Sequence, residues 1–266
     1  MTASIKGIIK KLVPERLRLI IRIRRWMRQG TDTELRLLPL LKGRGAFIDV
    51  GANVGSWAGP ACRIFSHVHA FEPDTKLARA LKDCAPRNLT VHAMALSDKK
   101  GVGIFSVPLS NGRRVEARGS LNRDANPGMA EEIRSVSMVT LDSLGLTGID
   151  AIKIDVEGHE EAVLAGACQT LQRERPSLII EIEERHHQGR SELIIANLVK
   201  SGFAAFFVRK NKVERFQPGM LSSLQRANHI TPEGQPKLDS YINNFIFVPL
   251  EKSGVIADVE RFVIAG

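Results

Sequence analysis

The sequence predicts an α/β domain built on a parallel sheet. Residues 46–50 form a short apolar run that stops at a glycine turn, and a second apolar run follows at 67–71 after a helical stretch. Residues 149–167 repeat this succession of strand, turn and helix. The chain has 266 residues, 43% of them hydrophobic, so it can bury a full core around one such sheet.

Most of the positive charge lies near the N-terminus. Residues 1–30 carry nine Lys and Arg against the single acid Glu15, which accounts for +8 of the net charge of +9. The rest of the chain is nearly neutral, which argues against nucleic acid as a partner. The three cysteines lack Cys-x-x-Cys spacing, so neither a zinc site nor a disulfide is indicated, and a reducing, cytoplasmic location is expected.

Residues 1–44 are predicted to form a basic helical appendage to this domain. Helical periodicity over 13–28 gathers on one side the apolar residues Leu19, Ile20, Ile23, Trp26 and Met27. No run reaches the ~20 apolar residues of a membrane span. Three interpretations stay open: a helix packed on the domain, a helix docked peripherally on a membrane or partner through residues 1–30, and an organelle-targeting peptide. A second, short helix is expected at 31–41, capped by Thr31 or Asp32.

The glycine turn after residue 50 indicates a nucleoside cofactor. Gly51 and Gly55 let the backbone approach a ligand, and Glu72 follows the second strand, where a carboxylate suits ribose hydroxyls. A dinucleotide would favour Gly-x-Gly-x-x-Gly, because the pyrophosphate lies against bare backbone. The acid Asp49 before the turn instead suits the cationic S-adenosylmethionine. A plain strand–helix crossover without ligand is the simpler alternative.

The strand and helix alternation stops after a third strand. That strand is expected at 89–96 and ends in Ser97-Asp98, so Asp98 is a candidate for binding an adenine amino group. Residues 102–107 and 136–141 are predicted as edge strands. The polar loop between them, at 108–130, is predicted as a lid on the acceptor side of the site, in which several arginines could hold a substrate.

A second group of polar residues follows the strand at 151–156. Asp155 and Glu157 stand two apart, so they project to the same side, and the strand at 176–183 brings Glu181 to the same edge. His159 lies in the first turn of the next helix, where the helix dipole favours a neutral imidazole that can act as a base. The remaining elements are predicted as a helix at 191–201, strands at 202–209 and 245–248, and a tail at 251–266.

These motifs, in this order, resemble the FkbM-type methyltransferases, which use S-adenosyl-L-methionine. The resemblance rests on FIDVGANVG (47–55), AFEP (70–73), ALSD (95–98), TLDSL (140–144), IKIDVEGHE (152–160) and RPSLIIEIE (175–183). It implies a Rossmann-like, seven-stranded, mostly parallel sheet with an antiparallel last strand and helices on both faces, over residues 45–250. It also implies the positions that hold the methionine part, the ribose and the adenine of the cofactor, which are Asp49, Gly51, Ala52, Asn53, Gly55, Glu72, Pro73, Ser97 and Asp98.

The reaction expected from this resemblance is methyl transfer to a hydroxyl of a sugar, glycan or secondary metabolite. An aliphatic hydroxyl needs a base, and Asp155 and His159 are the candidates, with Glu157 or Glu181 as orienting groups. A divalent metal held by Asp155, Glu157 and Glu181 is an open alternative, although the sequence does not indicate one.

Two other classes of function remain open. A nicotinamide-dependent oxidoreductase could use Glu72 on the ribose, but the third glycine and a Tyr-x-x-x-Lys pair are missing, since Tyr241 is the sole tyrosine. A membrane-docked binding module without catalysis could rely on residues 1–30. A nucleic-acid methyltransferase is disfavoured, because no Asn-Pro-Pro-Tyr or Asp-Pro-Pro-Tyr motif occurs.

Overall fold

An eight-stranded, mostly parallel sheet forms the centre of the protein. The computed structural model describes residues 14–30, 32–230 and 240–263. The strand order is β11-β10-β12-β9-β8-β1-β2-β3. In chain order the strands are β1 (Ala46–Val50), β2 (His67–Phe71), β3 (Leu89–His92), β8 (Ile149–Ile154), β9 (Ser177–Glu181), β10 (Phe203–Arg209), β11 (Lys212–Arg215) and β12 (Asn244–Pro249).

The predicted sheet is confirmed, with one strand more than expected. The last strand, β12, lies between β9 and β10 and is antiparallel to both, as the family pattern implies. The additional strand, β11, forms an antiparallel hairpin with β10 at the sheet edge. The region beyond residue 211 therefore continues the sheet before it becomes irregular.

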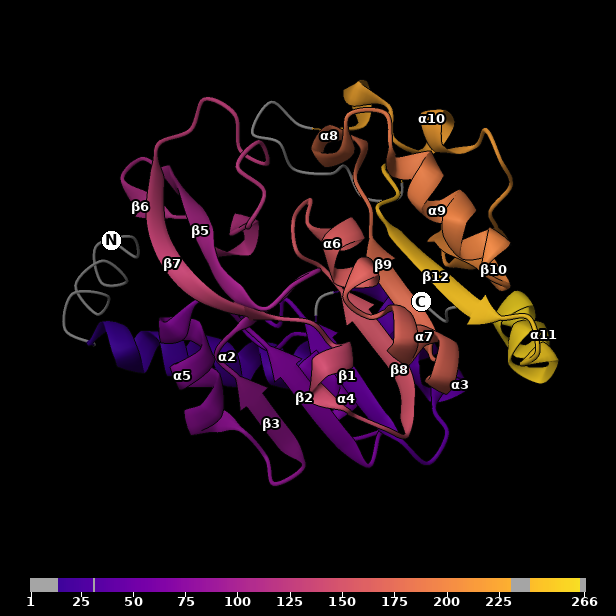
Figure 1. Cartoon of the computed structure of the whole chain (residues 1–266), viewed down its shortest axis with the longest axis horizontal. Coiled ribbons are helices and arrows are strands. Elements are labelled where there is room, and N and C mark those ends of the chain that lie inside the picture. Colours follow the sequence, from indigo (N-terminus) through magenta and orange to yellow (C-terminus); the bar gives the residue numbers. More distant parts are fainter. Residues whose placement is uncertain (1–13, 31, 231–239, 264–266) are drawn as a thin grey trace, which may run out of the picture.

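Helices cover both faces of this sheet (Figure 1). Alternate residues of β1 point to opposite faces, so Phe47 joins one apolar cluster and Ile48 the other. The first cluster includes side chains from α2 (Glu15–Gln29), α3 (Leu38–Leu41), α4 (Ala58–Ala61), α5 (Thr75–Cys84) and α11 (Ser253–Arg261). The second includes side chains from α6 (Glu160–Ala165), α7 (Cys168–Glu174), α9 (Ser191–Lys200) and α10 (Leu221–Leu224).

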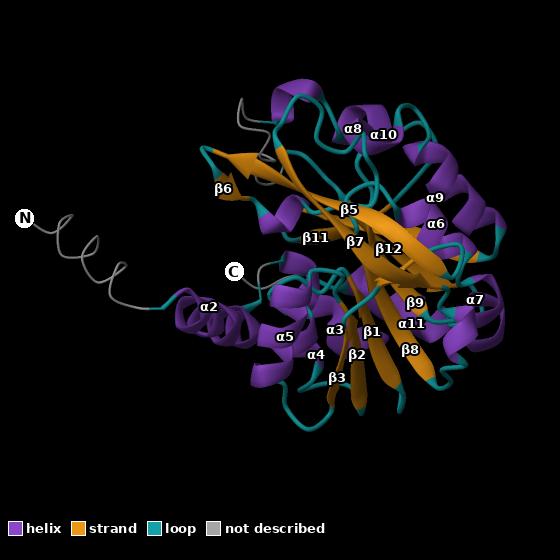
Figure 2. Ribbon diagram, turned by 60° about the vertical axis from the view of Figure 1, so that its left-hand side comes forward, coloured by secondary structure: helices purple, strands orange, loops and turns teal. Residues whose placement is uncertain are grey.

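A second, four-stranded sheet arches over the carboxyl ends of the parallel strands (Figure 2). It consists of β4 (Ala95–Leu96), β5 (Gly101–Ser110), β6 (Arg113–Arg114) and β7 (Glu131–Val139). The single strand expected at 89–96 is therefore two strands, because β4 leaves β3 and pairs with β7. The expected edge strands form a hairpin of their own, which is stabilised by a small core around Phe105 and Met138.

The N-terminal helix α2 packs on the domain. Ile23 and Met27 are buried, and the helix contacts α4 and α5. The approach is close at Gly59, where a Cβ atom would lie 2.3 Å from the carbonyl oxygen of Met27. The predictions for residues 1–13 lie outside the described residues.

The helix expected at 31–41 consists of two short pieces, η1 (Thr33–Leu37) and α3. Asp32 stands at the N-cap of η1 without capping it through its side chain, and its carboxylate accepts a hydrogen bond from Trp57 Nε1 instead. The C-terminal segment is more regular than expected, since α11 occupies much of the predicted tail and buries Val259.

Candidate functional site

The glycine turn after β1 is wound tightly against the end of β8. Gly51 and Gly55 have positive φ angles of 83° and 77°, and Asn53 also adopts a left-handed conformation with a φ of 45°. A Cβ atom on Gly51 would lie 1.8 Å from the carbonyl oxygen of Asp155. Position 51 therefore requires glycine for both its conformation and its space.

Glu72 holds the turn from the end of β2. Its Oε2 accepts a hydrogen bond from the backbone N–H of Asn53, and its Oε1 accepts one from Asp74, each at 2.7 Å. The side chain is buried, and burial raises the pKa of Glu72 to about 8 despite these two hydrogen bonds. A pKa of about 8 means that this carboxyl is mostly protonated at pH 7.

Asp49 lies beneath the turn, on β1. It is 1% exposed, and its Oδ2 has no hydrogen-bond partner among the described residues. Burial raises the pKa of Asp49 to about 7, although the positive charge of Lys153 opposes the shift. An unpartnered carboxylate oxygen at this depth can accept a hydrogen bond from a cationic ligand.

Ser97 and Asp98 follow β4 as predicted and lie beside His159. The Ser97 hydroxyl donates to Asp98 Oδ1 at 3.0 Å and lies 2.9 Å from His159 Nε2. Burial lowers the pKa of His159, so the imidazole is neutral at pH 7. The histidine predicted as a base thus has its hydrogen bond at the position expected for the adenine end of the cofactor.

The acids Asp155, Glu157 and Glu181 come together as the strand pattern predicts. Each offers a carboxylate oxygen within 4.8 Å of the other two. Glu157 adopts a left-handed conformation with a φ of 52°, which is strained for this residue type and turns the chain between β8 and α6. Burial raises the pKa of Asp155 to about 7 and that of Glu181 well above its usual value, because neighbouring carboxylates add to the desolvation.

A buried lysine, Lys153, stands next to this acid cluster. Its Nζ atom lies 3.1 Å from Asn244 Oδ1 and 4.0 Å from Asp155 Oδ2, and it is 5.4 Å from the centre of the Trp57 ring. Burial alone lowers the pKa of Lys153, but the surrounding carboxylates outweigh it and raise the pKa above its usual value. Sequence reasoning missed this residue, although a charged side chain inside an otherwise apolar strand is a signal that could have found it.

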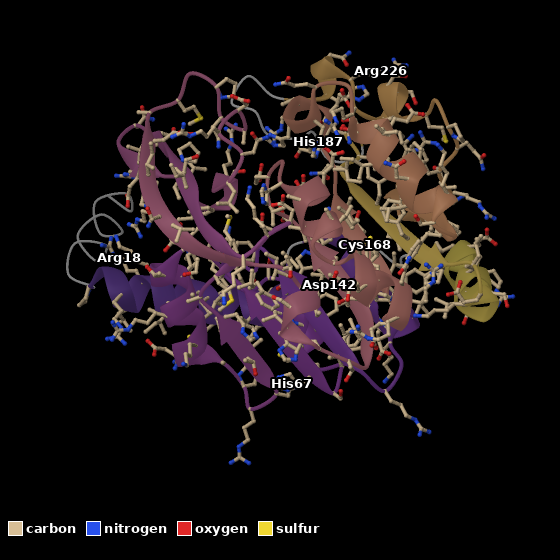
Figure 3. The ribbon with its side chains drawn as sticks, viewed as in Figure 1. Arg18, His67, Asp142, Cys168, His187 and Arg226 are labelled. Atoms are coloured by element: carbon tan, nitrogen blue, oxygen red, sulfur yellow. The ribbon has the colours of Figure 1, made fainter. Side chains whose placement is uncertain are left out.

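Further polar side chains hold the acids in place. His186 Nε2 lies 3.0 Å from Glu157 Oε2, and Asn243 Nδ2 donates to Glu181 Oε1 at 2.7 Å. His187 lies at the end of α8 (Glu184–His187), and its Nε2 atom is 2.8 Å from Glu160 Oε2. Figure 3 labels His187 near one end of the molecule and His67, the first residue of β2, at the opposite end, where the parallel strands begin.

Two adjoining cavities open along the strand ends. The first lies under Glu72 and Pro73 and reaches His159, with Ala95 and Leu96 of β4 on one side. The second, of about 440 Å³, contains Asp49, Ala52, Asp155 and Glu181 in its lining. The two cavities share the linings Gly51, Asn53, Glu116, Ala117 and Asp155.

Residues 115–121, which include η2 (Glu116–Arg118), form a roof over both cavities. The predicted lid therefore covers the proposed cofactor residues as well as the acids. Arg22 of α2 forms a salt bridge with Glu116 at 2.8 Å, and Arg114 forms one with Asp74. Burial alone raises the pKa of Asp74, but the hydrogen bond from Arg114 lowers it below its usual value.

The model of the FkbM methyltransferase domain matches residues 49–226. Among curated proteins, none matches the chain.

Solved structures of methyltransferases are similar at low identity. The FkbM methyltransferase from Methylobacillus flagellatus KT is 15% identical, with a TM-score of 0.48 over 87% of this chain. The alignment spans 59% of that protein. An rRNA methylase from Streptococcus thermophilus is 11% identical, with a TM-score of 0.44 over 82% of this chain and 94% of its own. The precorrin-6y C5,15-methyltransferase from Geobacter metallireducens GS-15 is 12% identical, with a TM-score of 0.41 over 80% and 86%.

Proposed function

The chain belongs to the FkbM methyltransferase family, and we propose that it transfers a methyl group from S-adenosyl-L-methionine to a hydroxyl of a sugar, glycan or other small metabolite. The observation that carries this proposal is the placement of Asp155. It stands between the two cavities, beside the glycine turn that would hold the donor and beside the acids that would face the acceptor.

The first cavity suits the nucleoside part of the cofactor. Glu72 and Pro73 would hold the ribose, and Ser97 and Asp98 would lie at the adenine end. His159 would hold Ser97 in place, because its hydrogen bond is with that hydroxyl. The methionine part would lie against the turn from Gly51 to Gly55, with its ammonium group near Asp49, whose unpartnered oxygen suits a cationic donor.

Asp155 is the proposed general base. The acceptor oxygen attacks the methyl carbon in line with the sulfur, the sulfur–carbon bond breaks, and S-adenosylhomocysteine leaves as a neutral thioether. The hydroxyl proton passes to Asp155 as the new carbon–oxygen bond forms. A pKa near 7 suits this role, since the carboxylate is both populated and basic at neutral pH.

Glu157 and Glu181 are proposed to orient the acceptor, each fixed by its own partner, His186 or Asn243. A bound divalent cation is the alternative explanation for the cluster of Asp155, Glu157 and Glu181. An all-oxygen ligand set suits magnesium, but Lys153 already supplies a positive charge 4.0 Å from Asp155. Activity that survives exhaustive chelation would favour the account without metal.

Mass spectrometry of candidate hydroxylated acceptors, incubated with isotopically labelled S-adenosylmethionine, tests the proposed function directly. The expected result is one labelled methyl group on an acceptor oxygen. Calorimetry separates the competing classes, because an oxidoreductase would bind NADH and a non-catalytic module neither cofactor. Binding of NADH without binding of S-adenosylmethionine would overturn the proposal.

The affinity for the nucleoside part of the cofactor is expected to rise with pH. Glu72 has a raised pKa of about 8, so it is mostly protonated at pH 7, whereas ribose hydroxyls donate to the ionised form. Binding should therefore release a proton, and the affinity should increase with pH up to about pH 8. The total increase should be about tenfold for each unit by which binding lowers the pKa of Glu72. Calorimetry in two buffers of different ionisation enthalpy measures both the proton release and the change in affinity. The ligand is 5′-methylthioadenosine, which lacks the titrating α-amino group of the methionine part. A pH-independent affinity would contradict the ribose role of Glu72.

The outer face of α2 is proposed to contact a membrane surface. Leu17 and Ile21, one helical turn apart, are 48% and 58% exposed, and the exposed residues Arg18, Arg25 and Arg28 accompany them. No described helix is long and apolar enough to cross a membrane. Replacing Leu17 and Ile21 together by serine is expected to lower co-sedimentation with phosphatidylserine vesicles severalfold, with unchanged cofactor affinity. Co-sedimentation equal to that of the unaltered chain would contradict the contact.

A further inference from the structure

One wall of the second cavity comes from outside the residues that match the family model. Arg22 and Trp26 of α2 line this cavity together with Asp32, and Asp155 and Glu181 belong to the same lining. The family match begins at residue 49, so these three side chains lie outside the matched residues.

This wall is fixed firmly to the domain. Met27 is buried against the glycine turn, where a Cβ atom on Gly55 would lie 3.0 Å from its Cγ. Arg63 donates to the carbonyl oxygens of Met27 and Arg28 at 3.2 and 3.1 Å. The helix therefore presents Trp26 to the cavity from a defined position.

The cavity combines indole rings with carboxylates. Trp26 and Trp57 both line it, and so do five acids, namely Asp32, Asp49, Glu116, Asp155 and Glu181. The two arginines of the lining are already engaged, Arg22 by Glu116 and Arg114 by Asp74. The five carboxyl groups outnumber the two arginines, so the lining offers more hydrogen-bond acceptors than cations.

Such a lining selects among acceptors by physical chemistry. Carboxylates accept hydrogen bonds from hydroxyl or ammonium groups, and an indole face packs against the C–H face of a sugar ring. A phosphate or a uronic acid would instead meet a lining in which carboxyl groups outnumber arginines and each arginine already binds a carboxylate, and like charges brought together out of water repel.

We propose that α2 is the acceptor-selecting wall of this enzyme. In this role Trp26 stacks on the ring of a neutral or amino sugar, while the acids of the same lining receive its hydroxyl groups and exclude anionic sugars. The proposal deepens the proposed function and rests on it, since it names the class of acceptor for the same site.

Intrinsic fluorescence gives a direct test, because Trp26 and Trp57 are the two tryptophans of the chain and both line the cavity. The full chain, with S-adenosylhomocysteine bound, is titrated with methyl α-glucopyranoside, glucosamine, glucuronate and glucose 1-phosphate. The first two are expected to change the emission in a saturable way, and the two anions are expected not to do so. Tighter binding of either anion, or no response to any of the four sugars, would overturn the proposal.

Variants then assign the effect to the helix wall. Trp26→Ala is expected to weaken sugar binding at least tenfold, with the remaining Trp57 as the reporter, while 5′-methylthioadenosine binding stays within twofold. Ile21→Ala, on the exposed face of the same helix, is the matched control and should bind sugar like the unaltered chain. Unchanged sugar binding by Trp26→Ala would overturn the role of this wall.

The outcome also separates this inference from the proposed function. Saturable sugar binding without any methyl transfer would refute the proposed reaction and leave the wall in place. Methyl transfer to an anionic sugar in preference to a neutral one would refute the wall and leave the reaction in place.

Discussion

Replacing Asp155 with asparagine is expected to lower the rate of methyl transfer by roughly 10²- to 10⁴-fold, the usual contribution of a general base. Asparagine keeps the shape of the side chain but cannot take the hydroxyl proton. Single-turnover measurements with labelled S-adenosylmethionine isolate this step, and cofactor affinity should change little, because the glycine turn contacts the backbone of residue 155 rather than its carboxylate.

The pH dependence of kcat/KM provides a second test of Asp155 as the base. The pKa of Asp155 is raised to about 7, so the ionised base is lost as the pH falls below this value. The unaltered enzyme should therefore gain kcat/KM with rising pH and level off above about pH 7, whereas the residual activity of Asp155→Asn should lose this limb. Asp150→Asn is the control, since this carboxylate stands on the same strand at its amino end and binds Gly43 and Gly45. A rate for Asp155→Asn within twofold of the Asp150→Asn rate would remove Asp155 from the mechanism.

The largest effect on stability is expected for Lys153→Met. Removing this cation takes the nearest positive charge from Asp49, which is buried, and from Asp155 and Glu181, which are partly exposed, and the expected cost is about 1–3 kcal/mol. Urea unfolding followed by circular dichroism measures the free energy of unfolding, and Lys200→Met, at the exposed end of α9, provides the control.

The loss of stability caused by Lys153→Met should increase with pH. The acids near Lys153 have raised pKa values, about 7 for Asp49 and Asp155, so at pH 5 they are mostly protonated in the folded protein and need no counter-charge. The destabilisation by Lys153→Met should therefore be small at pH 5 and grow as the pH rises through 7. Asp155→Asn should lower the free energy of unfolding less in the Lys153→Met variant than in the unaltered chain, since the two side chains interact. A destabilisation that is equal at pH 5 and pH 8 would rule out the electrostatic origin.

The parts of the fold that sequence could predict are those set by local pattern. The apolar run before Gly51 and the positive φ angles that glycine permits identify the β1 turn without any tertiary information. Asp155 and Glu181 follow from the rule that parallel strands end at one edge of a sheet. Their proximity was therefore predicted correctly from strand positions alone.

Other features depend on pairings that no local pattern encodes. The hairpin of β5 and β7 has the alternation of edge strands, and only the strand pairing in the structure shows that it forms a separate sheet with its own small core around Phe105. His159 was predicted in the first helical turn but stands at the N-cap of α6, and the direction of its side chain follows from the position of Ser97, 62 residues earlier. Lys153 was missed because Asp49 and Glu181, two of the acids that neutralise it, come from other strands.

The close contact between Gly51 and the carbonyl oxygen of Asp155 also limits how such an enzyme can evolve. Any side chain at position 51 would push β1 and β8 apart, so the donor turn and the proposed base cannot diverge independently. Trp26 carries no such restriction, because its side chain is only partly buried where it lines the second cavity. Related chains can therefore acquire new acceptors by changing this position of α2 while they keep the donor turn.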